Sequence, residues 1–216
     1  MTDVFRILVI CDPQLQNEVE TIIGKLRDDI SILYWQKGSS KESIELAWKE
    51  ENLWGVVFSV YSDYILPPHA LSKIRIPLNI HPALPNNPSV GYDVYPRIHG
   101  EDKCGATIHW MEKKIDHGVV LETEPIPLPH SATYPIIRKL NQTAVLSLFE
   151  KWLRLASEAS KQALLERLQV PANKGRGWTG PCTSERMRRA KLIEFKQNNP
   201  LKWDSLEIPL TVFAIK

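Results

Sequence analysis

The chain has 216 residues, enough for one domain of ordinary size with a hydrophobic core of its own. Its 27 Lys and Arg residues against 25 Asp and Glu residues give a formal net charge of +2. Nucleic-acid-binding proteins usually carry a stronger and more clustered basic excess, so this balance disfavours a nucleic-acid partner. No apolar run approaches the roughly 18 residues of a membrane span, and none resembles a secretory signal core. We therefore expect a cytoplasmic protein with no membrane partner.

The three cysteines, Cys11, Cys104 and Cys182, lie far apart and form no C-x-x-C pair. Their odd number and wide spacing indicate neither a disulfide framework nor a zinc knuckle, and they favour a reducing compartment. The scattered His and Cys residues give no reason to place a metal ion, so the sequence predicts no metal site.

Strand and helix patterns alternate over the first sixty residues. The strand patterns lie at residues 7–10, 30–35 and 54–60, and the helix patterns lie between them at 15–26 and 39–48. The apolar run at 7–10 is continuous, which is typical of a strand buried on both faces. This alternation predicts a doubly wound α/β sheet. Such sheets bind ligands beyond the carboxyl ends of their strands, so the loops after Ile10 and Val60 are the first places to expect a site.

Short strands and one long helix follow in the second half of the chain. Strand patterns lie at 76–80, 105–111 and 118–126, and a helix pattern covers 137–155. Pro171 breaks this helical pattern, and the tail ends in an apolar pattern at 209–215 that predicts a short strand. We expect a main domain over residues 1–170 and a small C-terminal extension over 171–216.

Residues 175–180, Gly-Arg-Gly-Trp-Thr-Gly, match the G-x-G-x-x-G pattern of dinucleotide-binding loops. That motif functions between a strand and the helix that it opens. Here a long helix pattern precedes it and Pro181 follows it directly, so we interpret the segment as a glycine-rich surface loop.

Asn79 and His81 are two residues apart at the end of a predicted strand, so their side chains share one face. Pro82 cannot donate to a sheet ladder, which places His81 next to a loop. A carboxamide beside an imidazole can stabilise a developing oxyanion, although Asn and His at a strand end are also common as turn and capping residues. Asp116 precedes another strand and could hold an imidazole, but it could equally be an ordinary turn residue. Spacing alone leaves these alternatives open.

Three motifs occur in a fixed order: Asn79-x-His81-Pro82-Ala83-Leu84-Pro85, Gly105-x-Thr107-x-His109 and Ile115-Asp116-x-Gly118. In this order and spacing they resemble the formyltransferases that use 10-formyltetrahydrofolate. That family includes glycinamide ribonucleotide and methionyl-tRNA formyltransferases, formyltetrahydrofolate hydrolase and the sugar-nucleotide N-formyltransferases. The resemblance covers about a third of the chain. It implies a Rossmann-like formyltransferase core with a mostly parallel, mixed sheet, and 10-formyltetrahydrofolate as co-substrate without a metal.

Matched residue by residue, the resemblance implies that Asn79, His81 and Asp116 form the catalytic triad. Asn79 would donate to the oxyanion, and His81 would stabilise the same charge or shuttle a proton. Asp116 would orient His81 and a water molecule that relays the proton. The resemblance also implies two folate-binding loops, which contain Ile65, Leu66 and Pro67, and Glu112, Lys113 and Ile115.

The branches of this family differ in features that surround the triad. The loop Cys11-Asp12-Pro13 lacks the glycines expected around a ribonucleotide phosphate. We expect the tail after Pro171 to be too short for a tRNA-binding β-barrel, and we expect no regulatory domain of the hydrolase type before Met1. Elimination leaves an N-formyltransferase acting on a nucleotide-linked amino sugar, such as a dTDP-4-amino-4,6-dideoxyhexose. The alternatives are a glycinamide ribonucleotide-type enzyme with an atypical phosphate site, and a folate-binding protein without turnover.

We assign Tyr92, Arg176 and Trp178 to the binding of this acceptor. An arginine can fork onto a phosphate and an indole can stack on a base, although a surface loop with one packed tryptophan fits the sequence equally well. The expected partners are small molecules, and a homodimer is compatible with the sequence. A basic run in the tail is typical of a solvated face; it consists of Arg186, Arg188, Arg189 and Lys191.

Overall fold

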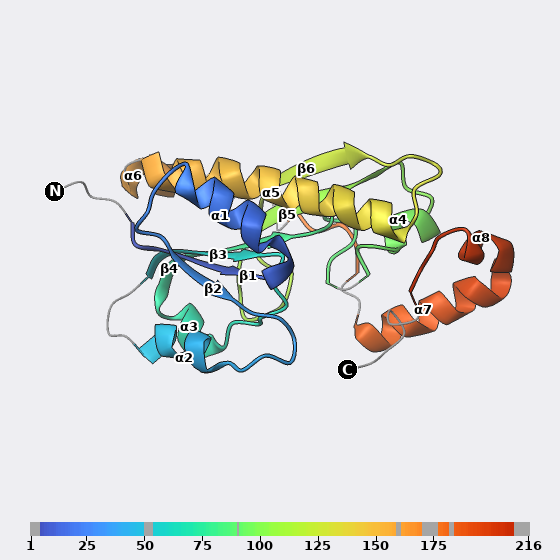
Figure 1. Cartoon of the computed structure of the whole chain (residues 1–216), viewed down its shortest axis with the longest axis horizontal. Helices are drawn as coiled ribbons and strands as arrows, with labels where there is room; N and C mark the ends of the chain where they lie inside the picture. Colours follow the sequence, from blue (N-terminus) through green and yellow to red (C-terminus); the bar gives the residue numbers. More distant parts are fainter. Residues whose placement is uncertain are drawn as a thin grey trace.

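The computed structural model of the chain describes residues 5–49, 54–89, 91–158, 161–169, 177–181 and 184–209. Within these residues, six strands form one sheet with the order β2-β1-β3-β4-β5-β6 (Figure 1). The strands are β1 Ile7–Cys11, β2 Ser31–Tyr34, β3 Trp54–Val60, β4 Ile74–His81, β5 Lys103–Trp110 and β6 Val120–Pro127. The first four strands in this order are parallel, whereas β5 is antiparallel to both of its neighbours. The prediction of an α/β fold with a mostly parallel, mixed sheet is confirmed.

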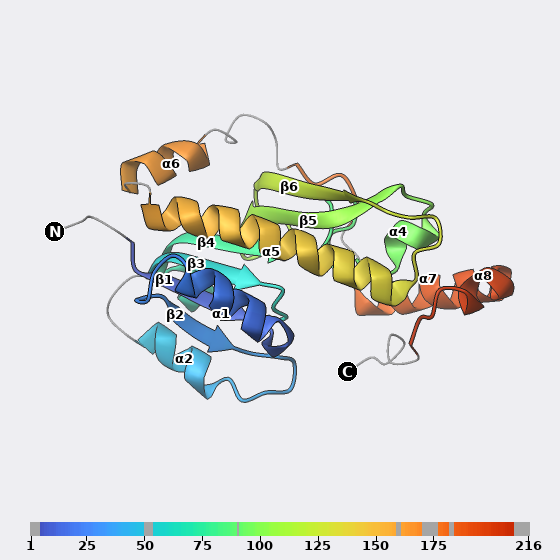
Figure 2. The same cartoon turned by 45° about the horizontal axis from the view of Figure 1, so that its top comes forward.

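Helices cover both faces of this sheet. The helices are η1 Pro13–Leu15, α1 Gln16–Gly24, α2 Glu42–Lys49, α3 Pro68–Leu71, α4 Tyr95–Ile98, α5 Tyr134–Glu158, α6 Lys161–Gln169, α7 Glu185–Asn198 and α8 Pro200–Asp204. Figure 1 shows α1 and α5 on one face of the sheet, with α2 and α3 on the other. In Figure 1 and in Figure 2, α7 and α8 lie beyond the end of the sheet.

The central strand β1 is buried on both faces because a helix layer covers each of them. Ile7 and Val9 belong to the apolar cluster that includes α1 and α5, whereas Leu8 and Ile10 belong to the cluster that includes α2. Successive side chains of a strand point to opposite faces, which explains this alternation. The continuous apolar run at 7–10 therefore forms the doubly buried strand that the sequence predicted.

The pairing of β4 with β5 determines which side chains meet at the carboxyl end of β4. The two strands are antiparallel, with Asn79 opposite His109 and His81 opposite Thr107. Directly opposed residues of an antiparallel pair point to the same face, with Cβ atoms about 5 Å apart. Since Asn79 and His81 also share a face, the sheet sets both of them beside His109.

The C-terminal extension packs on the rest of the molecule through a small apolar cluster. Leu192 of α7 and Trp203 of α8 are buried there together with Val94. The division into residues 1–170 and 171–216 stays a prediction, and beyond residue 209 the strand predicted at 209–215 lies outside the described residues. None of the described helices combines the length and the apolar character that crossing a membrane would require.

Candidate active site

A cavity of about 690 Å³ opens at the carboxyl ends of β3 and β4, the edge where doubly wound sheets bind ligands. Its volume is that of an ordinary small-molecule site. The loop after β3 lines this cavity, as the sequence predicted, and so do the loops after β2, β4 and β5. The loop after β1, which the sequence also singled out, does not line it.

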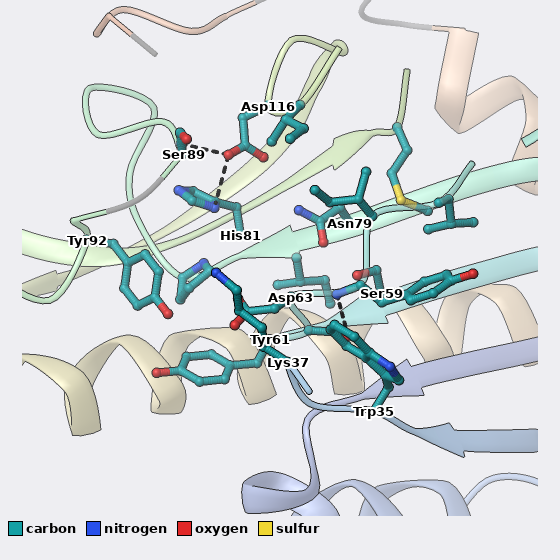
Figure 3. Close-up of a pocket in the computed structure, with 18 of the residues that line it drawn as sticks. Trp35, Lys37, Ser59, Tyr61, Asp63, Asn79, His81, Ser89, Tyr92 and Asp116 are labelled. Carbon is teal, nitrogen blue, oxygen red and sulfur yellow. Dashed lines mark hydrogen bonds and ion pairs between the residues drawn. The ribbon is translucent and has the colours of Figure 1, made fainter. Parts of the chain in front are cut away.

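The three residues of the predicted triad all line this cavity. Asn79 and His81 come from the end of β4, and Asp116 comes from the loop between β5 and β6. Asp116 Oδ2 lies 3.5 Å from His81 Nδ1. Figure 3 shows the Asp116 carboxylate directed at the His81 ring, with Asn79 along the same strand as His81. Residues that are far apart in the sequence therefore meet at one point.

His109 of β5 joins the triad, and the sequence analysis did not include it among the site residues. Its Nε2 lies 3.0 Å from Asn79 Nδ2 and 3.3 Å from Asp116 Oδ1. His109 thus links Asn79 to Asp116, while His81 contacts Asp116 from the other side. His109 belongs to the motif that begins at Gly105, and this motif is the sequence signal that points to it. Its place opposite Asn79 depends on the register of β4 and β5, which the sequence does not specify.

Both imidazoles have one nitrogen next to a main-chain carbonyl. His81 Nε2 lies 3.0 Å from the carbonyl oxygen of Asn87, and His109 Nδ1 lies 2.9 Å from that of Trp110. A carbonyl oxygen only accepts, so each of these nitrogens carries a proton and donates. The other nitrogen of each ring faces Asp116. Asp116 therefore lies between two imidazoles and can stabilise either of them as an imidazolium.

Asp116 is buried, with 7% of its surface exposed. Burial alone would raise its pKa, but His81, His109 and a hydrogen bond from the Ser89 N–H outweigh that effect and hold the pKa of Asp116 well below its usual range. The Ser89 N–H donates to Asp116 Oδ2 at 2.7 Å. The site thus holds a fixed negative charge at neutral pH, placed to stabilise an imidazolium that forms during a reaction.

Backbone strain gathers around the same cavity. Three of the lining residues, Tyr61, Ser89 and Asp116, have φ values of 53°, 68° and 47°. Positive φ is unfavourable for residues other than glycine, above all for a bulky residue such as Tyr61. Such conformations persist where the surrounding structure enforces them, and they are common at active sites.

Gly118 allows the Asp116 loop to approach β5 closely. A Cβ added at Gly118 would lie 1.6 Å from the carbonyl oxygen of Trp110. Only glycine fits there, because a main-chain carbonyl cannot move aside as the end of a long side chain can. The close approach fixes the loop two residues after Asp116.

The two loops predicted to bind folate both contribute residues to the cavity lining. Ile65 and Leu66 line the cavity from one loop. Glu112, Lys113 and Ile115 line it from the other. Pro67 lies beside this lining, as the N-cap of α3. Ile65 and Ile115 are 64% and 45% exposed, which is unusual for isoleucine, so the mouth offers apolar contacts to a ligand.

The residues assigned to acceptor binding lie in different places in the structure. Tyr92 lines the cavity, and its ring centroid lies 5.9 Å from that of His81. Trp178 is half-buried and packs edge-on against the rings of His81 and His109. Its indole N–H donates to the carbonyl of Gly118 at 2.8 Å. Arg176 lies outside the described residues. The assignment of Tyr92, Arg176 and Trp178 to acceptor binding stays a prediction.

Arg188 differs from the solvated face that we predicted for the basic run of the tail. It is half-buried and lines the cavity, because α7 packs against the domain with this residue directed inward. Its neighbours Arg186 and Arg189 are exposed, as expected. The C-terminal extension therefore supplies one cation to the cavity wall.

The cavity has two halves of different chemistry on either side of His81. The apolar half contains Trp35, Leu66, Leu71, Met111 and Ile115. The tyrosine half contains Tyr61, Tyr92, Asp93, Tyr134 and Arg188. In the view of Figure 3, Tyr92 lies to the left of the triad and Trp35 to its lower right. The cavity lining thus offers two chemically different surfaces near the triad. Among the described residues, no cluster of His, Cys, Asp and Glu is arranged to hold a metal ion.

Comparisons with known proteins point to one family. The family model described as formyl transferase matches residues 30–144, slightly more than half of the chain. A comparison with curated proteins gave no match.

Three solved structures illustrate the similarity of fold. A sugar N-formyltransferase from Shewanella sp FDAARGOS_354 is 20% identical, with 71% of this chain and 70% of that chain covered and a TM-score of 0.56. The formyltransferase PseJ from Anoxybacillus kamchatkensis, solved with UDP-4,6-dideoxy-4-formamido-L-AltNAc and tetrahydrofolate, is 15% identical; the match covers 96% and 97% of the two chains, with a TM-score of 0.60. Phosphoribosylglycinamide formyltransferase from Anaplasma phagocytophilum is 16% identical over 71% of this chain and 87% of that one, with a TM-score of 0.56.

Proposed function

The chain belongs to the formyl transferase family, and from that premise we propose that it moves the formyl group of 10-formyltetrahydrofolate to the amine of a nucleotide-linked amino sugar. The observation that carries this proposal is the meeting of Asn79, His81 and Asp116 between two chemically different halves of one cavity. A two-substrate transfer needs two ligands that meet at one set of reacting groups.

The reaction joins the acceptor amine to the formyl carbon. The amine nitrogen attacks this carbon, a C–N bond forms, and the carbonyl π electrons move to the oxygen as a tetrahedral intermediate. The intermediate then collapses, the bond from the formyl carbon to N10 breaks, and N10 keeps the electron pair. One proton leaves the amine and one proton reaches N10, so the products are the formamide and tetrahydrofolate.

Asn79 supplies a hydrogen-bond donor for the oxyanion. Its carboxamide nitrogen has two N–H groups, and one of them can donate to His109 Nε2 when that nitrogen carries no proton. The second can donate to the oxygen of the intermediate without any rearrangement, which is the arrangement that stabilises a transition state most.

His81 and His109 can carry the proton while Asp116 stays ionised. Each ring directs one nitrogen at Asp116, and the carboxylate stabilises an imidazole that becomes charged by taking up the proton. An imidazolium at His81 also adds positive charge beside the oxyanion. A proton taken from the amine can thus remain within this group until N10 accepts it.

The apolar half of the cavity is suited to the folate. A pterin is a flat heterocycle, and the exposed Ile65 and Ile115 of the cavity lining offer apolar contacts to such a ring. Lysines surround this half at the cavity mouth, where they can attract the carboxylates of the folate tail; they are Lys37, Lys41, Lys113 and Lys114.

The tyrosine half is suited to a nucleotide-linked sugar. Aromatic rings and carboxylates are common in sugar sites, and the Arg188 guanidinium can contact a diphosphate. The loop Cys11-Asp12-Pro13 does not line the cavity, which speaks against a ribonucleotide phosphate bound there. PseJ, whose structure contains a UDP-linked formamido sugar, resembles this chain over nearly its whole length, the extension included.

The test offers several acceptors in parallel. The protein is incubated with 10-formyltetrahydrofolate and either UDP- or dTDP-linked amino sugars, glycinamide ribonucleotide or methionyl-tRNA, and the release of tetrahydrofolate is measured. We expect the amino-sugar nucleotides to react fastest, and Asn79→Ala to lower kcat at least about a hundredfold. Faster formylation of glycinamide ribonucleotide or methionyl-tRNA would contradict the acceptor class. Folate binding without turnover on any acceptor would support a binding protein instead.

A further inference from the structure

Asp93 is a buried carboxyl group in the tyrosine half that has one oxygen without a partner. The residue is 8% exposed and lines the cavity. Its Oδ2 lies 3.9 Å from Arg138 Nη1, while its Oδ1 has no hydrogen-bond partner within the described part of the chain. Buried polar atoms are nearly always hydrogen-bonded, so an unpaired carboxylate oxygen on a cavity wall calls for an explanation.

Protein groups only partly compensate the burial of this carboxyl. Burial raises the pKa of Asp93 to about 7, even though Arg138, Tyr134 and Arg188 favour the charged form. A neutral asparagine would have the same shape without this penalty. The folded protein alone thus gains little from an acid at position 93, which is what we expect of a residue that serves a ligand.

Asp93 lies at the far end of a row of contacts that starts at the triad. The Tyr92 ring centroid is 5.9 Å from that of His81 and 6.1 Å from that of Tyr61. The Arg138 guanidinium lies 5.9 Å from the Tyr61 ring and pairs with Asp93. This row links Asp93 to His81 through Arg138 and the two tyrosine rings, and Asp93 and His81 line the same cavity.

We propose that Asp93 recognises the sugar of the acceptor, with Oδ1 accepting a hydrogen bond from a ring hydroxyl while the amine of the same sugar reaches Asn79 and His81. This inference rests on the proposed function. The amine itself is not the group that Asp93 binds, because the amine must lie at the formyl carbon beside the triad. Asp93 is then a specificity-determining residue, since a sugar without that hydroxyl leaves the oxygen unpaired.

The test combines two variants with matched acceptors. Wild type, Asp93→Asn and Asp93→Ala are assayed with amino-sugar nucleotides and with analogues that each lack one ring hydroxyl. Hydrogen bonds to a charged group contribute about 1.5–3 kcal/mol, so we expect the acceptor KM to rise about tenfold to a hundredfold in Asp93→Ala, with a much smaller change in kcat. For wild type, one deoxy analogue should have a KM that is higher than that of its parent by the same factor. Asp93→Ala should not distinguish that analogue from its parent.

Controls separate this inference from the proposed function. The affinity for tetrahydrofolate should be the same in wild type and both variants, and Asp12→Asn, in the loop that does not line the cavity, should leave the acceptor KM unchanged. If wild type formylates no amino-sugar nucleotide, the proposed function fails. If wild type is active and the acceptor KM of both Asp93 variants stays within twofold of the wild-type value, the role of Asp93 is overturned. The role is also overturned if removing each ring hydroxyl raises the acceptor KM of Asp93→Ala as much as it raises that of wild type.

Discussion

The indole ring of Trp178 meets the imidazole of His109 edge-on, with ring centroids 5.0 Å apart and an angle of 77° between the planes. It makes a similar contact with His81 at 5.8 Å. Trp178 lies outside the segment that matches the family model, and yet it touches both histidines of the site. A residue from the C-terminal extension thus completes the surroundings of the catalytic groups.

The segment around Trp178 also connects the loop that contains Asp116 to the loop that follows His81. The indole N–H donates to Gly118 in the loop of Asp116. The N–H groups of Thr179 and Gly180 donate to the carbonyl of Pro85, in the loop that follows His81. Packing and hydrogen bonds at this one segment therefore fix the distance between His81 and Asp116.

We predict that Trp178→Ala lowers kcat by about tenfold or more and changes the acceptor KM less, because the indole contacts the catalytic rings. Trp178→Phe retains an aromatic edge but loses the hydrogen bond to Gly118, so its kcat should lie between that of wild type and that of Trp178→Ala. Steady-state kinetics with the acceptor varied gives both constants. A stacking role on the nucleotide predicts the reverse, a large rise in KM with kcat nearly unchanged.

His109 should be as important as the residues of the predicted triad. We expect His109→Gln to lower kcat about a hundredfold or more, because an amide side chain cannot take up the proton that leaves the acceptor amine. The shape of the pH–rate profile should also change, because the variant has one imidazole fewer beside Asp116. His99→Gln is the matched control, because His99 is exposed and does not line the cavity. A variant with normal kcat and an unchanged pH profile would show that His109 has no part in the proton transfer.

The sequence predicted the sheet well because its central strands are continuous apolar runs. Burial on both faces requires such a run, as at 7–10, and the alternation with helices then specifies the fold class. Asn79, His81 and Asp116 could be named because each belongs to a short motif with fixed spacing.

The rest of the site depends on contacts between distant segments. His109 lies next to Asn79 only through the register of β4 with β5, and Trp178 reaches the site only through the path of the chain after α6. Arg188 belongs to a basic run that resembles a solvated face, and only the packing of α7 decides which member points inward. Asp93 carries no motif at all, and its burial becomes apparent only in three dimensions.

Gly118→Ala should disturb the active site with little effect elsewhere. The added Cβ would overlap the carbonyl of Trp110, so the loop that carries Asp116 must move away from β5. We expect kcat to fall at least about tenfold, since small displacements of catalytic groups have large effects. Thermal unfolding should show a loss of more than about 1 kcal/mol.

A matched control for this substitution exists in α1. Gly24 is helical, and a Cβ added there meets nothing within 4 Å. Gly24→Ala should therefore leave kcat unchanged and stabilise the protein by at most about 0.5–1 kcal/mol, because Gly24 is the last residue of α1. If the two alanine variants behave alike in kcat, the close approach at Gly118 does not matter for the position of Asp116.

The last prediction concerns the effect of pH on the stability contributed by Asp93. The pKa of this carboxyl is about 7 in the folded protein and has its ordinary value of 3.8 in the unfolded chain. Between these pH values the folded state binds more protons, so raising the pH lowers the free energy of unfolding. From pH 5 to pH 8 the loss is on the order of 2–3 kcal/mol.

Asp93→Asn removes this titration and resembles the protonated acid in shape. The variant should match wild type near pH 5 and become more stable than wild type as the pH rises to 8. Titratable and charged groups face Asp93 from several elements and are present in both proteins, so the difference between the two curves isolates Asp93; they are Arg138 and Tyr134 of α5, Arg188 of α7, Tyr61 and Asp63 after β3, and Tyr92. Urea unfolding at several pH values measures it. A difference that does not change with pH would mean that Asp93 does not titrate in this range. A variant that is more stable at pH 8 and yet binds the acceptor more weakly would show that this acid is retained for the ligand at the expense of the fold.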